Sequence, residues 1–154
     1  MNARIATVQD ASEIVRLAAL LFESMGLSTA WEPRWREEGE RHVRDRLGGD
    51  LAVFVVDDPL QAGRLAASAA GIITHRLPTP ANPAGLAGYV QWVCTDPQYR
   101  GRGHARAVME RLLNWYDERA VGTVELHSTP MAESLYRALG FDDSGARALR
   151  RRRS

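Results

Sequence analysis

The 154-residue chain has no lysine and one cysteine, and both shortages restrict what it can do. A single thiol, Cys94, excludes an internal disulfide framework and a cysteine-rich zinc site. No histidine, cysteine or acidic residues have the spacing of metal ligands, so no metal is expected. The formal net charge of +1 is too small for a protein that coats nucleic acid, so no nucleic-acid partner is expected.

Long apolar runs are absent as well. The N-terminus lacks the apolar core of a secretory signal, and no run approaches the roughly 20 apolar residues that span a membrane. These absences predict a cytoplasmic protein without a membrane partner. The length fits one core, so we expect residues 1–154 to form a single domain. The basic end at 150–154 is predicted to be a disordered tail, with binding of an acidic partner or nucleic acid as the alternative.

The spacing of apolar residues predicts alternating strands and helices in a mixed α/β fold. Strands are expected at about 4–8, 51–56, 65–75, 87–95 and 123–128, with a final strand or tail from Phe141. Helices are expected at about 11–25, 34–47, 105–116 and 131–139.

The predicted helix at 34–47 is mostly charged, with a thin apolar side that includes Trp35 and Val43. Together with Trp31 just before it, this helix either covers a cleft or forms a solvated face held by two tryptophans. Four acidic residues in this region could attract a cationic amine: Glu23, Glu32, Glu37 and Glu38.

The most informative stretch is a strand, a glycine-containing turn and a helix start at residues 89–106. Gly101 and Gly103 allow the backbone to approach an anion closely, and a helix start offers free N–H groups. Arg100, Arg102 and Arg106 add positive charge around the turn. The pattern predicts a diphosphate-binding turn. It is not a P-loop, because no Gly-Lys-Ser/Thr follows, and the third glycine of a dinucleotide-binding fingerprint is missing.

Two segments together resemble the GNAT N-acetyltransferase superfamily. Val93 to Ala105 resembles its acetyl-coenzyme A signature, with Arg100, Gly103 and Ala105 at the positions of the pattern Gln/Arg-x-x-Gly-x-Gly/Ala. Leu135 to Phe141 resembles the downstream Leu-Tyr-x-x-Leu-Gly-Phe. The predicted order of strands and helices also matches, so the resemblance covers nearly the whole chain.

The resemblance implies a mixed, mostly antiparallel sheet of about six to seven strands, flanked by about four helices. Two neighbouring parallel strands, at about 87–95 and 123–129, would splay apart and hold acetyl-coenzyme A (acetyl-CoA). Backbone groups of Val93, Cys94 and Thr95 would pair with the pantetheine arm. The N–H groups of Gly101, Arg102, Gly103, His104 and Ala105 would bind the pyrophosphate. Arg100 and Arg102 would either contact phosphate or face solvent.

The resemblance also assigns roles in catalysis. Tyr136 would be the acid that protonates the departing thiolate, or else would simply pack in its helix. Many relatives have a glutamate as general base where this chain has Gln91, which cannot accept a proton at neutral pH. Other base candidates remain open, as does the absence of any dedicated base; they are Glu125, His127, Asp96 and Glu23. Cys94 is interpreted as a small buried hydrophobe rather than a nucleophile.

The sequence therefore predicts an enzyme, an acetyl-CoA-dependent N-acetyltransferase that acts by direct attack of a primary amine. The acceptor would be a small molecule or a peptide, chosen by the segments 24–47 and 77–86. The alternative is a catalytically weak acyl-CoA-binding module that senses the donor or regulates a partner. Because members of the superfamily often dimerise, a homodimer is one expected assembly.

Overall fold

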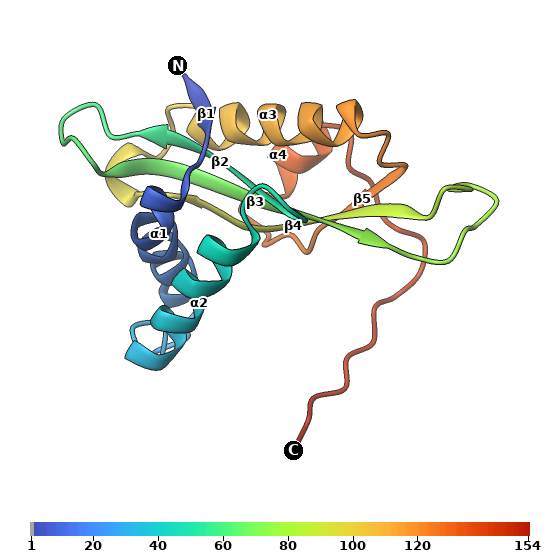
Figure 1. The fold of residues 1–154 in the computed structure, drawn as a ribbon, viewed down its shortest axis with the longest axis horizontal. Helices are drawn as coiled ribbons and strands as arrows, with labels where there is room; N and C mark the ends of the chain where they lie inside the picture. Colours follow the sequence, from blue (N-terminus) through green and yellow to red (C-terminus); the bar gives the residue numbers. More distant parts are fainter. Residues whose placement is uncertain (1) are drawn as a thin grey trace.

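The computed structural model describes residues 2–154 and contains one five-stranded mixed sheet with helices on both faces (Figure 1). The strands are β1 (Ala3–Ile5), β2 (Leu51–Asp57), β3 (Leu65–His75), β4 (Leu86–Thr95) and β5 (Thr123–Glu125). The α-helices are α1 (Ala11–Ser24), α2 (Pro33–Arg46), α3 (His104–Glu118) and α4 (Glu133–Ala138). Two short 3₁₀ turns, η1 (Val8–Asp10) and η2 (Pro97–Tyr99), precede α1 and α3. Every helix within 2–154 is too short or too polar to cross a bilayer.

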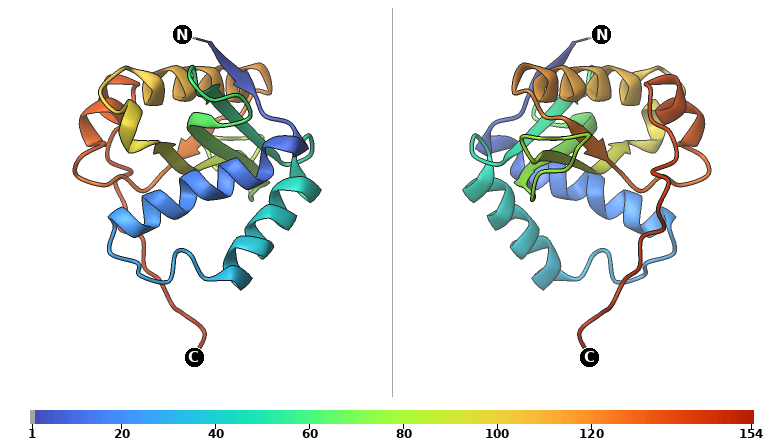
Figure 2. Two further views of the ribbon diagram at one scale, coloured as in Figure 1. Left: turned by 90° about the vertical axis from the view of Figure 1, so that its left-hand side faces the viewer. Right: turned by 90° about the vertical axis from the view of Figure 1, so that its right-hand side faces the viewer.

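The sheet separates two helical layers, with α1 and α2 on one face and α3 and α4 on the other (Figures 1 and 2). The alternation of β2 explains both layers, since successive side chains point to opposite faces. Val53 and Val55 pack in the core with α1, whereas Phe54 and Val56 pack in the core with α3. Burial on both faces makes β2 a continuous apolar run rather than a polar–apolar alternation.

Small residues in the sheet allow α3 to approach closely. The Tyr116 hydroxyl lies 3.0 Å from the carbonyl oxygen of Ile72 and 3.2 Å from that of Tyr89, so α3 links β3 to β4. Gly71 and Gly88 leave the room that the Tyr116 side chain occupies. The small side chains of β3 therefore allow α3 as well as α1 to pack closely on the sheet.

A β-bulge in β4 ends its pairing with β5. The pairing is antiparallel throughout the order β1-β2-β3-β4, and β5 joins β4 in parallel over residues 87–89 only. Farther along β4, Trp92 and Val93 both oppose the single residue Ala69, and Trp92 has φ +53°. Such a bulge bends and twists the strand that carries it. Beyond Tyr89, β4 therefore pairs with β3 on one edge, and no strand within residues 2–154 pairs with the other.

The predicted mixed α/β fold and the two parallel strands are confirmed, but the predicted strand count is wrong. The described residues form five strands rather than six to seven, and β5 ends at Glu125 rather than near 128. β5 is short because β4 has turned away. Of the two expectations for the chain from Phe141, a strand or a tail, the tail is observed, because Asp142, Asp143 and Gly145 supply no alternating apolar face to bury. The exposed chain beyond α4 instead extends away from the sheet on the side of α1 and α2 (Figure 1).

Candidate active site

The glycine turn between β4 and α3 presents several free backbone N–H groups. Gly101 and Gly103 have φ of +77° and +81°, conformations that favour glycine. Gly103 is the N-cap of α3, and its carbonyl accepts the first helical hydrogen bond, from Ala107. The N–H groups of His104, Ala105 and Arg106 consequently precede the helical hydrogen-bond ladder. The turn predicted from the sequence therefore has the geometry of an anion site.

Buried contacts hold this turn in place. Tyr99, at the end of η2, is 2% exposed and donates its hydroxyl proton to Asp58, in the connection between β2 and β3. Asp96 accepts from the Gln98 N–H at the start of η2 and forms an ion pair with Arg16 of α1 at 3.0 Å. The same guanidinium binds Glu13 at 2.8 Å. Asp96 is therefore an anchor for the turn and is not free to act as a base.

The three arginines of the turn differ in their contacts. Arg102 lies over the ring of Tyr99, with its guanidinium carbon 5.5 Å from the ring centroid. Arg106 pairs with Glu110 one helical turn later. Arg100 is exposed on the approach to the turn. All three keep positive charge close to the free N–H groups.

The last residues of β4 supply the unpaired strand edge. Cys94 and Thr95 pair with Ser68 and Ala67 of β3, while their other edge faces away from any strand. Val93 belongs to the bulge itself. The backbone groups of Val93, Cys94 and Thr95 thus lead from the bulge directly into the glycine turn, as one continuous polar track.

Tyr136 of α4 is 7% exposed and packs edge-on against Phe141, with ring centroids 6.0 Å apart. Burial raises the pKa of its phenol to about 12, and the neighbouring Cys94 thiol adds to the shift. Burial also raises the pKa of the Cys94 thiol to about 12. Both groups therefore stay protonated at neutral pH, so Tyr136 carries a proton and Cys94 is not a thiolate nucleophile.

Three other base candidates from the sequence are engaged in contacts of their own. Glu125 pairs with Arg76 at 3.2 Å, and the Trp31 indole N–H donates to Glu23 at 2.7 Å. His127 Nδ1 shares a hydrogen bond with the Tyr89 hydroxyl. Neither these residues nor Asp96 line the cavity described next.

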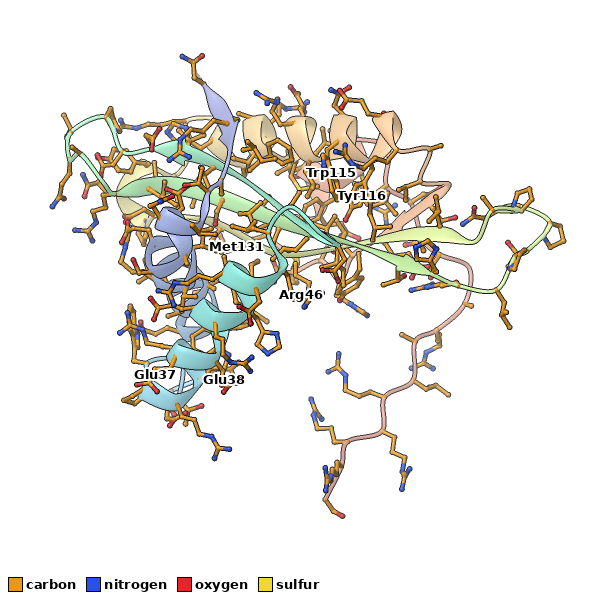
Figure 3. All side chains as sticks on the ribbon, viewed as in Figure 1. Glu37, Glu38, Arg46, Trp115, Tyr116 and Met131 are labelled. Atoms are coloured by element: carbon orange, nitrogen blue, oxygen red, sulfur yellow. The ribbon has the colours of Figure 1, made fainter. Side chains whose placement is uncertain are left out.

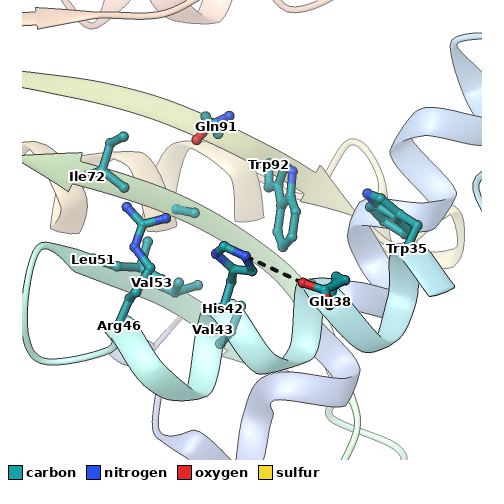
Figure 4. A pocket seen from close by; sticks show the side chains of 12 residues that line it. Trp35, Glu38, His42, Val43, Arg46, Leu51, Val53, Ile72, Gln91 and Trp92 are labelled. Atoms are coloured by element: carbon teal, nitrogen blue, oxygen red, sulfur yellow. Dashed lines mark ion pairs between the residues drawn. The ribbon is translucent and has the colours of Figure 1, made fainter.

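A cavity of about 300 Å³ lies between α2 and the sheet, beside the bulge (Figure 4). Helical spacing gives α2 two stripes along this cavity. The apolar stripe consists of Trp35, Gly39 and Val43, and the polar stripe consists of Glu38, His42 and Arg46. From the sheet, Gln91 and Trp92 are adjacent in sequence yet line the same cavity, because the bulge breaks the alternation of β4. The charged helix therefore covers a cavity, which was one of the two interpretations of its sequence.

His42 and Arg46 were not among the predicted site residues. Both sit in a highly charged helix, where a single sequence gives no reason to separate cavity-facing from solvent-facing side chains. A signal in the sequence could have found them: His42 and Arg46 follow Glu38 at i+4 and i+8, which places all three on one helix face next to the apolar stripe.

The fold and the site define a protein that can hold an extended phosphorylated molecule along one strand edge, beside a cavity for a second, small molecule. The model of the acetyltransferase (GNAT) family matches residues 19–141. The chain therefore belongs to the acetyltransferase (GNAT) family. This assignment confirms the predicted family, and with it the class of acetyltransferases.

Among curated proteins, the chain is similar to glucosamine 6-phosphate N-acetyltransferase 1 of Oryza sativa subsp. japonica, at 33% identity over 95 residues. The match covers 62% of this chain, and it spans about half of the rice protein, 55% of its length.

Solved structures share the fold. One is a predicted acetyltransferase with acetyl-CoA from Clostridium acetobutylicum, with a TM-score of 0.84 and 24% identity over 97% of this chain and 95% of that chain. Another is a GCN5-related N-acetyltransferase from Ralstonia eutropha, with a TM-score of 0.80 and 22% identity over 97% of both chains. A glucosamine-6-phosphate N-acetyltransferase from Arabidopsis thaliana has a TM-score of 0.67 and 20% identity over 98% and 99%.

Proposed function

We propose that the chain transfers the acetyl group of acetyl-CoA directly to the primary amine of an acceptor bound in the α2 cavity. The bulge of β4 is the observation that carries this proposal. Its residues border the unpaired strand edge, while Gln91 and Trp92 also line the cavity. A donor along that edge and an acceptor in the cavity would meet at the same short stretch of backbone.

The residues of the glycine turn and of β4 fit acetyl-CoA. Free N–H groups at a helix start suit a diphosphate, and an unpaired strand edge suits the amides of a pantetheine arm. His104 Nδ1 is buried and has no hydrogen-bond partner among residues 2–154, so it too is available to a ligand. Burial and the charge of Arg102 lower the pKa of this imidazole, which keeps it neutral. Bound there, acetyl-CoA would supply an activated carbonyl and a thiolate leaving group.

Tyr136 is the proposed acid. Its phenol would give a proton to the thiolate sulfur as the C–S bond breaks and the acceptor nitrogen forms the new C–N bond. With its pKa raised to about 12, the phenol remains protonated until that moment. The proton of the attacking nitrogen would pass to water or to an acceptor in the cavity. Direct attack needs no acetylated cysteine, in keeping with the buried, protonated Cys94.

Acetyl-CoA consumption with a panel of primary amines tests the proposal, with mass spectrometry of the acetylated product. Tyr136→Phe should lower kcat by about 10²-fold or more while CoA binding stays unchanged. Full activity in this variant would remove Tyr136 from the mechanism.

A second candidate function is a catalytically weak acyl-CoA-binding module. The observation that favours it is Gln91, which lines the cavity at the position where a carboxylate would act as base. CoA binding without an acetylated product across a broad amine panel would support this module and contradict the transferase.

A further inference from the structure

The α2 cavity is mostly apolar. Its volume of about 300 Å³ is at the small end of ligand pockets, which suits a body no larger than a substituted ring. Trp35 and Trp92 lie with ring centroids 6.1 Å apart, and Phe22 packs edge-on against Trp35 at 5.6 Å. The other apolar residues of the wall are Val43, Leu51, Val53, Ala70 and Ile72. Apolar and aromatic walls of this kind stabilise an apolar ligand by removing its surface from water.

The arginine in the lining is already neutralised. Asp50 binds Arg46 through Nε at 3.1 Å and through Nη2 at 2.6 Å, a two-point contact. This contact lowers the pKa of Asp50, so the carboxylate remains charged. A phosphate that entered the cavity would be repelled by the Asp50 carboxylate and would find only those Arg46 N–H groups that Asp50 leaves free.

Glu38 is the acidic residue of the lining, and its carboxylate is paired with Arg41 outside the lining, as Arg46 is paired with Asp50. Glu38 Oε2 lies 2.6 Å from Arg41 Nη2 and 3.8 Å from His42 Nε2 (Figure 4). A carboxylate accepts several hydrogen bonds, so Glu38 can accept one more, from an ammonium or amine. The imidazole of His42 and the side-chain carbonyl of Gln91 are further acceptors in the same wall. Glu38, the one charged acceptor in the lining, can pair with one ammonium group of a ligand. A second ammonium group on the same ligand would lie against the tryptophans and aliphatic residues.

We propose that the cavity selects a primary amine carried on an uncharged, apolar body, with its nitrogen toward Glu38, His42 and Gln91. Phosphorylated amino sugars and polyamines are poor acceptors. This inference rests on the proposed function and names the acceptor class of the same site. It separates this chain from its rice relative, whose name gives glucosamine 6-phosphate as the acceptor.

The first experiment compares kcat/KM for 2-phenylethylamine, glucosamine 6-phosphate and spermidine with the purified chain and acetyl-CoA. We expect 2-phenylethylamine to exceed each of the others by about tenfold or more, because an unpaired buried charge weakens binding at least that much. A kcat/KM for glucosamine 6-phosphate or spermidine equal to or above that of 2-phenylethylamine would overturn the proposal.

Two neighbouring glutamates of α2 provide a matched pair of variants (Figure 3). Glu38→Gln should lower kcat/KM for 2-phenylethylamine by about tenfold, since a neutral amide replaces the charged acceptor. Glu37 was one of the four acidic residues expected to attract an amine, but it is exposed and outside the cavity lining, so Glu37→Gln should leave kcat/KM unchanged. Equal effects of the two substitutions would contradict the assigned role of Glu38.

Asp50→Asn adds a gain-of-function test. It frees the Arg46 guanidinium, so the ratio of kcat/KM for glucosamine 6-phosphate over 2-phenylethylamine should rise by about tenfold. An unchanged ratio would show that Asp50 does not exclude phosphate.

Calorimetric titration of 2-phenylethylamine into the CoA-bound protein separates failure of this inference from failure of the proposed function. Binding that weakens in Glu38→Gln, with no amine acetylated, would support the acceptor class and refute the transferase. No binding of 2-phenylethylamine, with acetylation of other amines intact, would refute the acceptor class alone.

Discussion

The ring of Tyr116 lies directly over Gly88: a Cβ added at Gly88 would come 2.6 Å from Tyr116 Cε1. We therefore predict that Gly88→Ala lowers the free energy of unfolding by about 1–3 kcal/mol, the usual cost of overpacking a rigid core. Denaturant titration would measure the loss. A double-mutant cycle with Tyr116→Leu supplies the control, because the cost at Gly88 should largely vanish without the ring. An undiminished cost would place the strain elsewhere.

Gly101→Ala is predicted to weaken CoA binding about tenfold, because an alanine is strained at the positive φ of Gly101 and would disturb the turn that is proposed to bind the diphosphate. Gly26→Ala is the matched control. Gly26 also has positive φ, +85°, and an open side, but it lies at the end of α1. Both variants should lose about 1–2 kcal/mol of stability from left-handed backbone strain. Fluorescence titration with CoA should show a weaker complex in Gly101→Ala alone, and equal affinities would argue against the turn as the diphosphate site.

Arg16→Met is predicted to lower the free energy of unfolding by about 3 kcal/mol, because it leaves Glu13 and Asp96 as unpaired, largely buried carboxylates. Arg44 of α2 is the comparison. Its exposed pair with Glu40 is 3.6 Å long, so Arg44→Met should cost under about 1 kcal/mol. Thermal and denaturant unfolding of the two variants would check the difference. Similar losses would mean that the Arg16 contacts are worth no more than a surface pair.

Alkaline pH should destabilise the fold partly through Tyr136. Its pKa is about 12 in the folded chain and about 10 when unfolded, so the fold favours the protonated phenol. This contribution to stability is complete below pH 10 and is lost as pH rises toward 12. Unfolding measured from pH 9 to pH 12 should show a shallower decline in Tyr136→Phe than in the parent chain. Parallel declines would indicate that Tyr136 titrates normally.

Local sequence patterns predicted most of the fold. The helices α1, α2 and α3 and the strands β2, β3 and β4 follow periodicities that a short stretch of sequence displays. The glycine turn was predictable for the same reason, because Gly101 and Gly103 lie two positions apart in the sequence and form the turn locally. Contacts between distant segments were not predictable. The Tyr89–His127 and Arg76–Glu125 pairs each join residues at least 38 positions apart, and both removed a candidate base.

A cleft under α2 was one of two interpretations of the sequence, but the residues that line it escaped prediction because they come from α2, β2, β3 and β4 together. His42 and Arg46 acquire a role only once α2 is laid across the sheet. The strand count failed for a related reason. The pairing of β4 with β5 ends at Tyr89 and Glu125, and the bulge at Trp92 that follows in β4 is marked by no local pattern in the sequence.

The bulge at Trp92, where two residues of β4 oppose one residue of β3, restricts which changes of sequence β4 can accept. Removing one residue from β4 there would restore regular alternation, turn Trp92 toward α3, and extend the parallel pairing with the chain after β5. Under the proposed function, a single deletion would remove both proposed binding places, whereas substitutions on α2 would alter the acceptor place alone. Changes of acceptor would then be accessible through point mutations in a surface helix, while a change in the length of β4 would affect both molecules.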